Sequence, residues 1–396
     1  MNLRERATAP ETRTSFFYFT LFMGNGAAGA YLPIWLVQQG VTEGEIGYIN
    51  AVPIIILIAI NLFVGRLADR ARDWRAAIVT GTIISGIAPF GLFFVDDFWG
   101  ILFFYSLTMV PLMAIGPVAD AAAIRMTRRR NTEFGVIRGW GTLGFMSFNA
   151  LAGFLTAVWG AIIFIPIFAG AGLLRAAAAL QLPHFRAQGE ENSEVTVPAG
   201  TAPPVRARLR EALKPWFVMA LFGSALLYSC HFLLQGFAAL IWKEAGISEA
   251  VIGPLVAIGA GAEAIMMFAF RRFASRFTAR NLMLAAAVTM AVRLAIMSAN
   301  PPVEMLFVLQ SLHAITFALG YLGTVNFIAN WTSEDIAAEA QSFFAVLVQV
   351  VSAGALIAFG YLTAAWGAGA FLAGAAMSAL GALSIIASLR LRPAAR

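Results

Sequence analysis

The chain has 396 residues, of which 60% are hydrophobic and only 12% are charged. Soluble globular proteins carry roughly 25% charged residues, so a body of this size cannot cover its surface with charge and needs lipid as its solvent. Its net charge of +6 does not indicate a nucleic-acid partner, because the basic residues occur in short runs between apolar stretches. The single cysteine, Cys230, excludes a disulfide framework and a Cys-based metal site.

Apolar stretches long enough to cross a bilayer recur along the sequence. A crossing helix needs about 20 residues. The first half contains six such stretches, at 15–37, 46–66, 75–94, 98–120, 133–157 and 159–181. The second half contains six more, at 215–242, 250–270, 280–299, 303–328, 337–361 and 364–389. The sequence therefore predicts an all-α membrane protein with twelve transmembrane helices.

The basic residues also predict the orientation of these helices. Outside the predicted helices, Lys243 is the only Lys or Arg in a loop that strict alternation places on the external side. The other basic residues lie in both tails, the central segment and the opposite loops, except that the loop 331–339 is acidic. Loops rich in Lys and Arg remain cytoplasmic. We therefore expect both termini in the cytoplasm of a bacterium and the chain in its inner membrane.

A polar segment divides the chain into two halves. Residues 183–214 contain several acids, prolines and arginines, which is typical of a flexible linker rather than of a buried core. The expected domains are a six-helix bundle at 1–182, a cytoplasmic linker at 183–214 and a second bundle at 215–396. The segment Gly153–Ala161 also recurs as Gly360–Ala368, with seven of nine residues identical, at the last hairpin of each half. Two pseudo-symmetric bundles are expected.

The loop after the second predicted helix carries a short motif, Gly65-Arg-Leu-Ala-Asp69-Arg70. It resembles the Gly-x-Leu-x-Asp-Arg loop of the major facilitator superfamily, whose fold has two parallel six-helix halves. The resemblance implies that Gly65, Asp69 and Arg70 form a latch that stabilises one state of a rocking cycle. A basic, solvated loop without that role is the alternative.

Ionisable residues inside membrane helices are costly and therefore indicate function. In the first half, Asp120 ends the fourth predicted helix and Arg138 lies early in the fifth, so the two side chains can meet across the intervening loop. Arg138 is the candidate for binding an anionic group in a bidentate fork, with Asp120 orienting it. A permanent brace is the alternative role. Arg175 is expected to extend to the headgroups near the end of its helix.

Several motifs make a more specific resemblance to the phenylpropionate permease and lactose permease branches of the superfamily. Phe134-Gly-Val-Ile-Arg138-Gly-Trp140-Gly is similar to their fifth-helix motif, and Gly29-Ala-Tyr31-Leu-Pro33 to their first-helix motif. The resemblance implies that Asp120 and Arg138 contact substrate. The candidate aromatic lining of a substrate cavity is Tyr31, Trp140, Phe145 and Phe317, although such residues also face lipid or pack in cores.

The second half resembles the same branches at Glu263, Arg293 and His313. We expect Glu263 to carry the coupled proton and to alternate between pairing with Arg293 and protonation, with His313 tuning it or relaying the proton. A structural Glu263–Arg293 ion pair and a hydrogen-bonded core histidine are the alternatives. His231 is expected to be a core residue.

The sequence departs from the lactose permease branch in ways that argue against a sugar substrate. The proton-carrying carboxylate one turn after the histidine of the tenth helix is replaced by Thr316, and the lysine one turn before it is replaced by Gln310. Phe145 stands where that branch stacks a tryptophan on galactoside. The pattern of Glu263, Arg293 and His313 without extra charges is more similar to the phenylpropionate permease group.

These features predict a proton-coupled symporter that takes up a small organic solute, such as an aromatic or other organic acid, by alternating access. An exporter of amphipathic compounds, a sugar or nucleoside symporter and a non-transporting sensor are the alternatives. The sequence has no ATP-binding loop, hydrolase motif or clustered metal ligands, so we expect no enzyme activity, no metal and no cofactor. The expected partners are the solute, protons and the lipid bilayer, and we expect a monomer.

Overall fold

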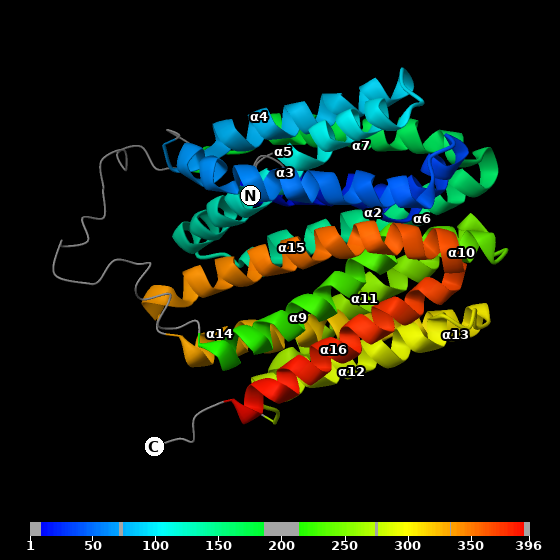
Figure 1. The fold of residues 1–396 in the computed structure, drawn as a ribbon. Coiled ribbons are helices and arrows are strands. Elements are labelled where there is room, and N and C mark those ends of the chain that lie inside the picture. The colour runs from blue at the N-terminus through cyan, green and yellow to red at the C-terminus, as the bar shows by residue number, and fades with distance from the viewer. Residues whose placement is uncertain (1–8, 71–73, 186–213, 274–275, 333, 392–396) are drawn as a thin grey trace. The chain divides into compact units, whose positions relative to one another are not determined.

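The computed structural model describes residues 9–70, 74–185, 214–273, 276–332 and 334–391. Within these ranges, the side chains of 61–70, 268, 271–273 and 334–338 lie outside the description. The described residues form helices joined by short turns, and none of them lies in a β-strand (Figure 1). The predicted all-α class is confirmed.

The first half contains long helices with short 3₁₀ segments at their ends. Their bounds are α2 (Pro10–Gln38), α3 (Glu43–Arg70), α4 (Trp74–Ile87), η1 (Ala88–Phe93), α5 (Phe98–Arg130), α6 (Phe134–Trp159), η2 (Ala161–Ile163) and α7 (Phe164–Leu180). The turn after α5 is made by Asn131 in the left-handed conformation, with φ of 52°. Asparagine tolerates that conformation at helix ends, and the chain then reverses into α6.

The second half also consists of long helices, and two of them include a π-helical segment. Their bounds are α9 (Pro215–Leu233), η4 (Leu234–Ala238), α10 (Ala239–Glu244), α11 (Glu249–Phe273), α12 (Ala279–Met297), α13 (Val303–Ser311), η5 (Ala314–Leu319), α14 (Gly320–Trp331), α15 (Glu334–Trp366), η6 (Gly367–Gly369) and α16 (Ala370–Arg390). The π-helical segment η4 joins α9 to α10 directly, whereas η5 is separated from the end of α13 by two residues and leads directly into α14.

Ten stretches of the described residues are long and apolar enough to cross a membrane. One of them, Glu339–Arg390, covers most of α15 and all of α16, while α2 is not among the ten. Tyr18, Asn25 and several glycines lower the mean hydropathy of α2. The helices expected from the sequence are therefore present, although hydropathy alone would not assign every one of them to the membrane.

The repeated nonapeptide has the same local structure in both copies. The helix α6 ends at Trp159, and Gly160 then takes a φ of 74° before the 3₁₀ segment η2. Likewise α15 ends at Trp366, and Gly367 takes a φ of 51° in the 3₁₀ segment η6. Glycine adopts positive φ without steric cost, so the shared Trp-Gly-Ala sequence encodes the same helix end twice.

The chain divides into two compact units. The first comprises Met1–Thr196 with Gly246–Ala257, and the second comprises Val197–Ala245 with Ile258–Arg396. The first unit therefore includes the start of α11, whereas the sequence placed that segment in the second bundle. The boundaries 1–182, 183–214 and 215–396 remain a prediction.

Within the first unit, α2 packs closely against α6 and also contacts α7. Glycines allow this approach: a Cβ on Gly26 would overlap the Phe145 carbonyl, and one on Gly144 would overlap the Phe19 carbonyl. Within the second unit, α9 packs against α16 and α15. There Gly223 and Gly381 face each other's carbonyls. Small residues at such crossings are how membrane helices gain close packing.

Candidate functional site

The acid of the first unit is held by a tyrosine. Asp120 lies on α5, and its Oδ1 accepts a hydrogen bond of 2.6 Å from the hydroxyl of Tyr18 on α2. Tyr18 is 1% exposed, whereas Asp120 is half-buried. Among the described residues, none donates a hydrogen bond to the second oxygen of Asp120. Tyr18 was not recognised in the sequence because its partner is 102 positions away.

The arginine of the first unit, Arg138, lies on α6 and contacts α2 one helical turn beyond Tyr18. The guanidinium carbon of Arg138 is 4.2 Å from the centre of the Phe22 ring. Phe22 follows Tyr18 by four residues, so both rings lie on the same face of α2. No described residue accepts a hydrogen bond from Arg138, which is half-buried. Its flat face is therefore occupied by an aromatic ring, while its N–H groups remain available.

The expected Asp120–Arg138 contact is not formed among the described residues. Both side chains contact the same stretch of α2, but each meets a different aromatic residue there. The physical reason is that α2 packs closely against α6, so Tyr18 and Phe22 of α2 lie within reach and each contacts one of the two side chains. The structure therefore places the acid and the arginine near one another without pairing them.

The expected aromatic lining is more dispersed. Tyr31 is fully buried, and its hydroxyl donates a bond of 3.3 Å to the carbonyl of Glu249 within the first unit. It lies about 13 Å along α2 from Phe22, at about 1.5 Å per residue. Trp140 is 45% exposed and meets Phe19 edge to face, and Phe145 is half-buried. The structure does not bring Tyr31 to Arg138.

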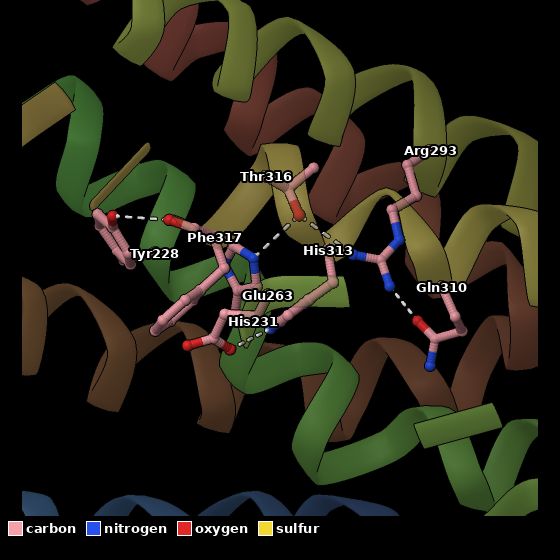
Figure 2. Close-up of polar contacts among 8 residues, drawn as sticks. All are labelled: Tyr228, His231, Glu263, Arg293, Gln310, His313, Thr316 and Phe317. Carbon is pink, nitrogen blue, oxygen red and sulfur yellow. Dashed lines mark hydrogen bonds and ion pairs between the residues drawn. The ribbon is translucent and has the colours of Figure 1, made fainter. Parts of the chain in front are cut away.

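The acid of the second unit is held by a histidine. Glu263 lies on α11, and its Oε2 is 3.3 Å from Nε2 of His313, which follows α13 (Figure 2). The His313 ring stacks on Phe317 with centroids 5.2 Å apart and 7° between the planes. Phe317, expected to line a substrate site, therefore also fixes the orientation of His313. Tyr228 supports Phe317 from α9, donating a bond of 3.4 Å to its carbonyl.

Among the described residues, the arginine of the second unit has neutral partners only. Arg293 on α12 is 1% exposed, and Nη2 donates to the side-chain oxygen of Gln310 while Nη1 donates to Oγ1 of Thr316 at 3.3 Å. The expected Glu263–Arg293 pair is absent from the contacts of the described residues. Both groups instead find partners on the helix after α12: Gln310 and Thr316 contact the arginine, and His313 between them contacts the acid (Figure 2).

His231 was expected to be a core residue, and it is buried, at 3% exposed. It is also part of the polar cluster, because Nε2 lies 3.3 Å from Oγ1 of Thr316. Its ring meets those of His313 and Phe317 edge to face at 5.1 and 5.2 Å. The sequence signal was present, since a histidine in an apolar helix is rare, but only the structure shows its partner.

Both histidines adjoin π-helical segments. His313 directly precedes η5, which contains Thr316 and Phe317, and His231 lies three residues before η4. A π segment shifts the direction of the following side chains and is frequent at functional sites. Here η5 carries two members of the cluster, so the irregular backbone sets where their side chains point.

The expectation for Arg175 is wrong. Its side chain is 1% exposed rather than extended to the headgroups, and Nη2 donates to the carbonyl and hydroxyl of Ser85 on α4, at 2.9 and 3.2 Å. The physical reason is that helical side chains lean toward the N-terminus of their helix. Arg175 lies near the C-terminal end of α7 and therefore leans into the bundle, away from Leu180.

The remaining expectations concern the latch and metals. The backbone of Gly65, Asp69 and Arg70 forms the end of α3, but their side chains lie outside the described residues, so the latch stays a prediction. No group of three His, Cys, Asp or Glu residues in the described part of the chain could hold a metal ion. Cys230 is a free, buried thiol.

Comparison with known proteins agrees with this architecture. The chain is 26% identical over 322 residues to a "Probable 3-phenylpropionic acid transporter" of Escherichia coli (strain K12), covering 79% of this chain and 80% of that protein. It is also 26% identical over 369 residues to a "Maltose permease" of Geobacillus stearothermophilus, covering 92% and 90%. The crystal structure of the nucleoside transporter NupG superposes with a TM-score of 0.79 at 17% identity, covering 96% of this chain and 99% of the other. That likeness shows the fold.

The profile of the MFS_1-like family matches residues 12–376, nearly the whole chain. The resemblance that the short motifs indicated is thereby confirmed. The chain belongs to the MFS_1-like family of the major facilitator superfamily and is a multi-pass membrane transporter.

Proposed function

We propose that the protein is a proton-coupled symporter that takes up a small organic acid, such as an aromatic acid, by alternating access. The observation that carries this proposal is the state of Arg138. Its guanidinium is half-buried and stacked on Phe22, and no described residue accepts its hydrogen bonds. A cation in that position attracts an anionic ligand.

A carboxylate fits this arginine for geometric reasons. A guanidinium donates two parallel hydrogen bonds to a carboxylate, and its weak hydration lowers the cost of binding in a partly buried site. Phe22 holds the plane from one side by a cation–π interaction and leaves the N–H edge open. Trp140 and Phe145, which lie on α6 with Arg138, are candidates to contact the apolar part of the solute. The 3-phenylpropionic acid named for one relative has this chemistry.

The proton site is assigned to Glu263, with His313 and Arg293 as its partners in coupling. Glu263 and His313 lie 3.3 Å apart inside the second unit, and imidazole can accept or return a proton near neutral pH. A change in burial or in charge during the cycle changes the proton affinity of such a carboxylate. Arg293 supplies the nearby positive charge that the cycle can bring to Glu263 or withdraw from it.

Further parts of the proposal rest on the sequence. The distribution of Lys and Arg supports a cytoplasmic location for both termini, in a bacterial inner membrane. Gly65, Asp69 and Arg70 are proposed as a latch between states. The protein is proposed to act as a monomer, because each bundle supplies its own acid and arginine.

A sugar or nucleoside is the second candidate substrate, and Asp120 favours it. One oxygen of Asp120 accepts no hydrogen bond from a described residue, and a free carboxylate oxygen suits a hydroxyl donor. The maltose permease and nucleoside transporter among the similar proteins carry substrates rich in hydroxyls. The two candidates differ in whether the solute must be anionic.

The test uses purified protein in liposomes with an imposed pH gradient and three labelled solutes: 3-phenylpropionate, maltose and uridine. We expect 3-phenylpropionate to accumulate and a protonophore to abolish the accumulation. Aromatic acids cross bilayers passively, so uptake is measured against protein-free liposomes and against Arg138→Gln. Accumulation of maltose or uridine without the acid would replace the acid by the second candidate. Protein-dependent accumulation in the opposite direction would indicate an exporter.

A further inference from the structure

His231 on α9 is a buried polar side chain that the Glu263–His313 pair does not require. Its Nε2 lies 3.3 Å from Oγ1 of Thr316, and Nη1 of Arg293 donates to the same oxygen, also at 3.3 Å. Figure 2 shows this oxygen joined by one dashed line to each nitrogen. Thr316 therefore links a titratable ring to a permanent cation.

The hydrogen-bond chemistry of Thr316 fixes the state of His231 in this structure. A guanidinium can only donate, so the oxygen of Thr316 accepts from Arg293. The hydroxyl proton of Thr316 can then point to Nε2 of His231, the other nitrogen within reach. With the ring proton on Nδ1, Nε2 accepts that hydrogen bond with its lone pair and the ring is neutral. A protonated ring would instead place two donors and two positive charges on one oxygen.

The charges that face His231 come from few elements. Arg293 faces it from α12, and His313 faces it from the start of η5, with Glu263 of α11 behind His313. Tyr228 faces it from α9 itself. The helices α15 and α16 also pack against α9, but residues 340–389 contain no Asp, Glu, Lys, Arg or His. The nearest permanent charge is thus that of Arg293.

We infer that His231 is a second proton-binding residue of the second unit, which Thr316 links to Arg293 so that the ring takes up a proton when a carboxylate neutralises this arginine. The inference rests on the proposed function for the source of that carboxylate, which is either the solute or Glu263. Nε of Arg293 has no partner among the described residues and can donate to it. One proton then passes from solvent to Nε2, Nε2–H donates to Thr316, and the Thr316 hydroxyl turns to the carboxylate.

This arrangement couples two binding events by linkage. A carboxylate at Arg293 favours a proton on His231, and a proton on His231 favours the carboxylate to the same degree. The link is absent if either Arg293 or the Thr316 hydroxyl is removed. His231 is thus a residue whose protonation reports the charge on Arg293, which a purely structural histidine would not do.

The experiment observes the ring directly. The chain has only three histidines, so magic-angle-spinning NMR of ¹⁵N-histidine-labelled protein in lipid bilayers can follow each of them, assigned with His184→Gln and His231→Gln. We expect His231 in the unaltered protein to remain neutral through neutral pH. In Arg293→Gln, the midpoint of its titration moves to higher pH, while exposed His184 is unchanged. An unmoved midpoint, or a protonated His231 at pH 7 in the unaltered protein, would overturn the inference.

A second variant covers the case in which Arg293→Gln does not fold. Thr316→Val keeps the shape of the side chain and removes the hydroxyl, so the Nε2 resonance of His231 should lose its hydrogen-bonded position. An unchanged resonance would also overturn the inference.

Adding 3-phenylpropionate at pH 7 then distinguishes the sources of the carboxylate. We expect the protonated fraction of His231 to rise in the unaltered protein and not in Arg293→Gln. A rise that persists in Glu263→Gln assigns the carboxylate to the solute, and one that disappears assigns it to Glu263. If the acid does not bind, the proposed function fails, whereas the effect of Arg293→Gln on ligand-free protein still decides the inference.

Discussion

The two units differ in which residues contact their acid and their arginine. Each contains a candidate acid and a candidate arginine on its helices, and in neither unit do the described residues pair the two. In the first unit Tyr18 holds Asp120 and Phe22 carries Arg138. In the second, His313 holds Glu263, while Gln310 and Thr316 hold Arg293.

Tyr18 and His313 differ in whether they can exchange a proton with the acid that they contact. A phenol keeps its proton at physiological pH and donates it in a hydrogen bond to a carboxylate, so Tyr18 exchanges no proton with Asp120. Imidazole can bind and release a proton, so the Glu263–His313 pair can share one. The first unit therefore offers fixed charges to a solute, and the second offers charges that change.

The strongest test of whether only the second unit exchanges protons is to neutralise each acid in turn. We expect Glu263→Gln to abolish pH-driven accumulation, to the level of protein-free liposomes, while exchange of labelled for unlabelled solute continues. Asp120→Asn should keep proton coupling and lose affinity. Uphill uptake and exchange in liposomes measure the two properties. Coupled uptake in Glu263→Gln would remove Glu263 from the proton pathway.

The arginine of the first unit is tested by solute affinity. Arg138→Gln should weaken binding of 3-phenylpropionate by about 10- to 100-fold, because a hydrogen bond to a charged group contributes about 1.5–3 kcal/mol. Calorimetric titration of purified protein measures the change. Arg125→Gln is the matched control, since Arg125 on α5 also lies over an aromatic ring, that of Trp74, at 4.5 Å. Equal affinity in Arg138→Gln would make this arginine a brace.

The close packing of α2 against α6 is tested with two glycines of α6. A Cβ on Gly144 would overlap the Phe19 carbonyl of α2, whereas a Cβ on Gly139 meets nothing within 4 Å. We expect Gly144→Ala to destabilise the protein by about 1–3 kcal/mol through overpacking. Gly139→Ala should be neutral or slightly stabilising. Thermal melting in detergent compares them, and equal melting temperatures would contradict the close α2–α6 contact.

The tyrosine that holds Asp120 should have a smaller effect. Tyr18→Phe removes a 2.6 Å hydrogen bond to a carboxylate and should cost about 1–2 kcal/mol of stability, with a few-fold loss of solute affinity. Melting and titration of the same preparation measure both. Tyr321→Phe serves as the control, because Tyr321 is 44% exposed. If Tyr18→Phe behaves like this control, Asp120 does not depend on the hydroxyl.

The smallest expected effect concerns an acid and an arginine that do pair, at the edge of the first unit. Glu11, before the predicted membrane stretch, pairs with Arg130 at the end of α5. Partial burial opposes ionisation, but the hydrogen bond and charge of Arg130 outweigh it, so the pKa of Glu11 lies below its ordinary value. A lowered pKa gives stability above the unfolded value of 4.5, which is lost as pH falls through the folded value.

Glu11→Gln should therefore lower the melting temperature slightly at pH 7, and the difference should vanish as the pH falls below 4.5. Melting curves of both proteins across this pH range measure it. Exposed pairs contribute little, so a large loss in Glu11→Gln would mean that this edge carries more of the fold than its exposure indicates.

The sequence by itself determined the class, the approximate helices and the residues that matter electrostatically. Long apolar runs can satisfy their backbone in lipid only as helices, and a charge within such a run is costly enough to stand out. The repeated Trp-Gly-Ala segment likewise predicted matched positions at Gly160 and Gly367, because a helix end at positive φ is encoded locally.

Only the tertiary structure decided which side chains meet. Spacing predicted that Asp120 and Arg138 meet each other, but each instead contacts an α2 residue that is distant in sequence, Tyr18 and Phe22 respectively. Glu263 and Arg293 were expected to pair, but they instead contact His313 and Thr316 on the helix after α12. There η5 sets the direction of the Thr316 side chain. Side-chain partners depend on the rotation and close packing of helices, which hydropathy and spacing along the chain do not specify.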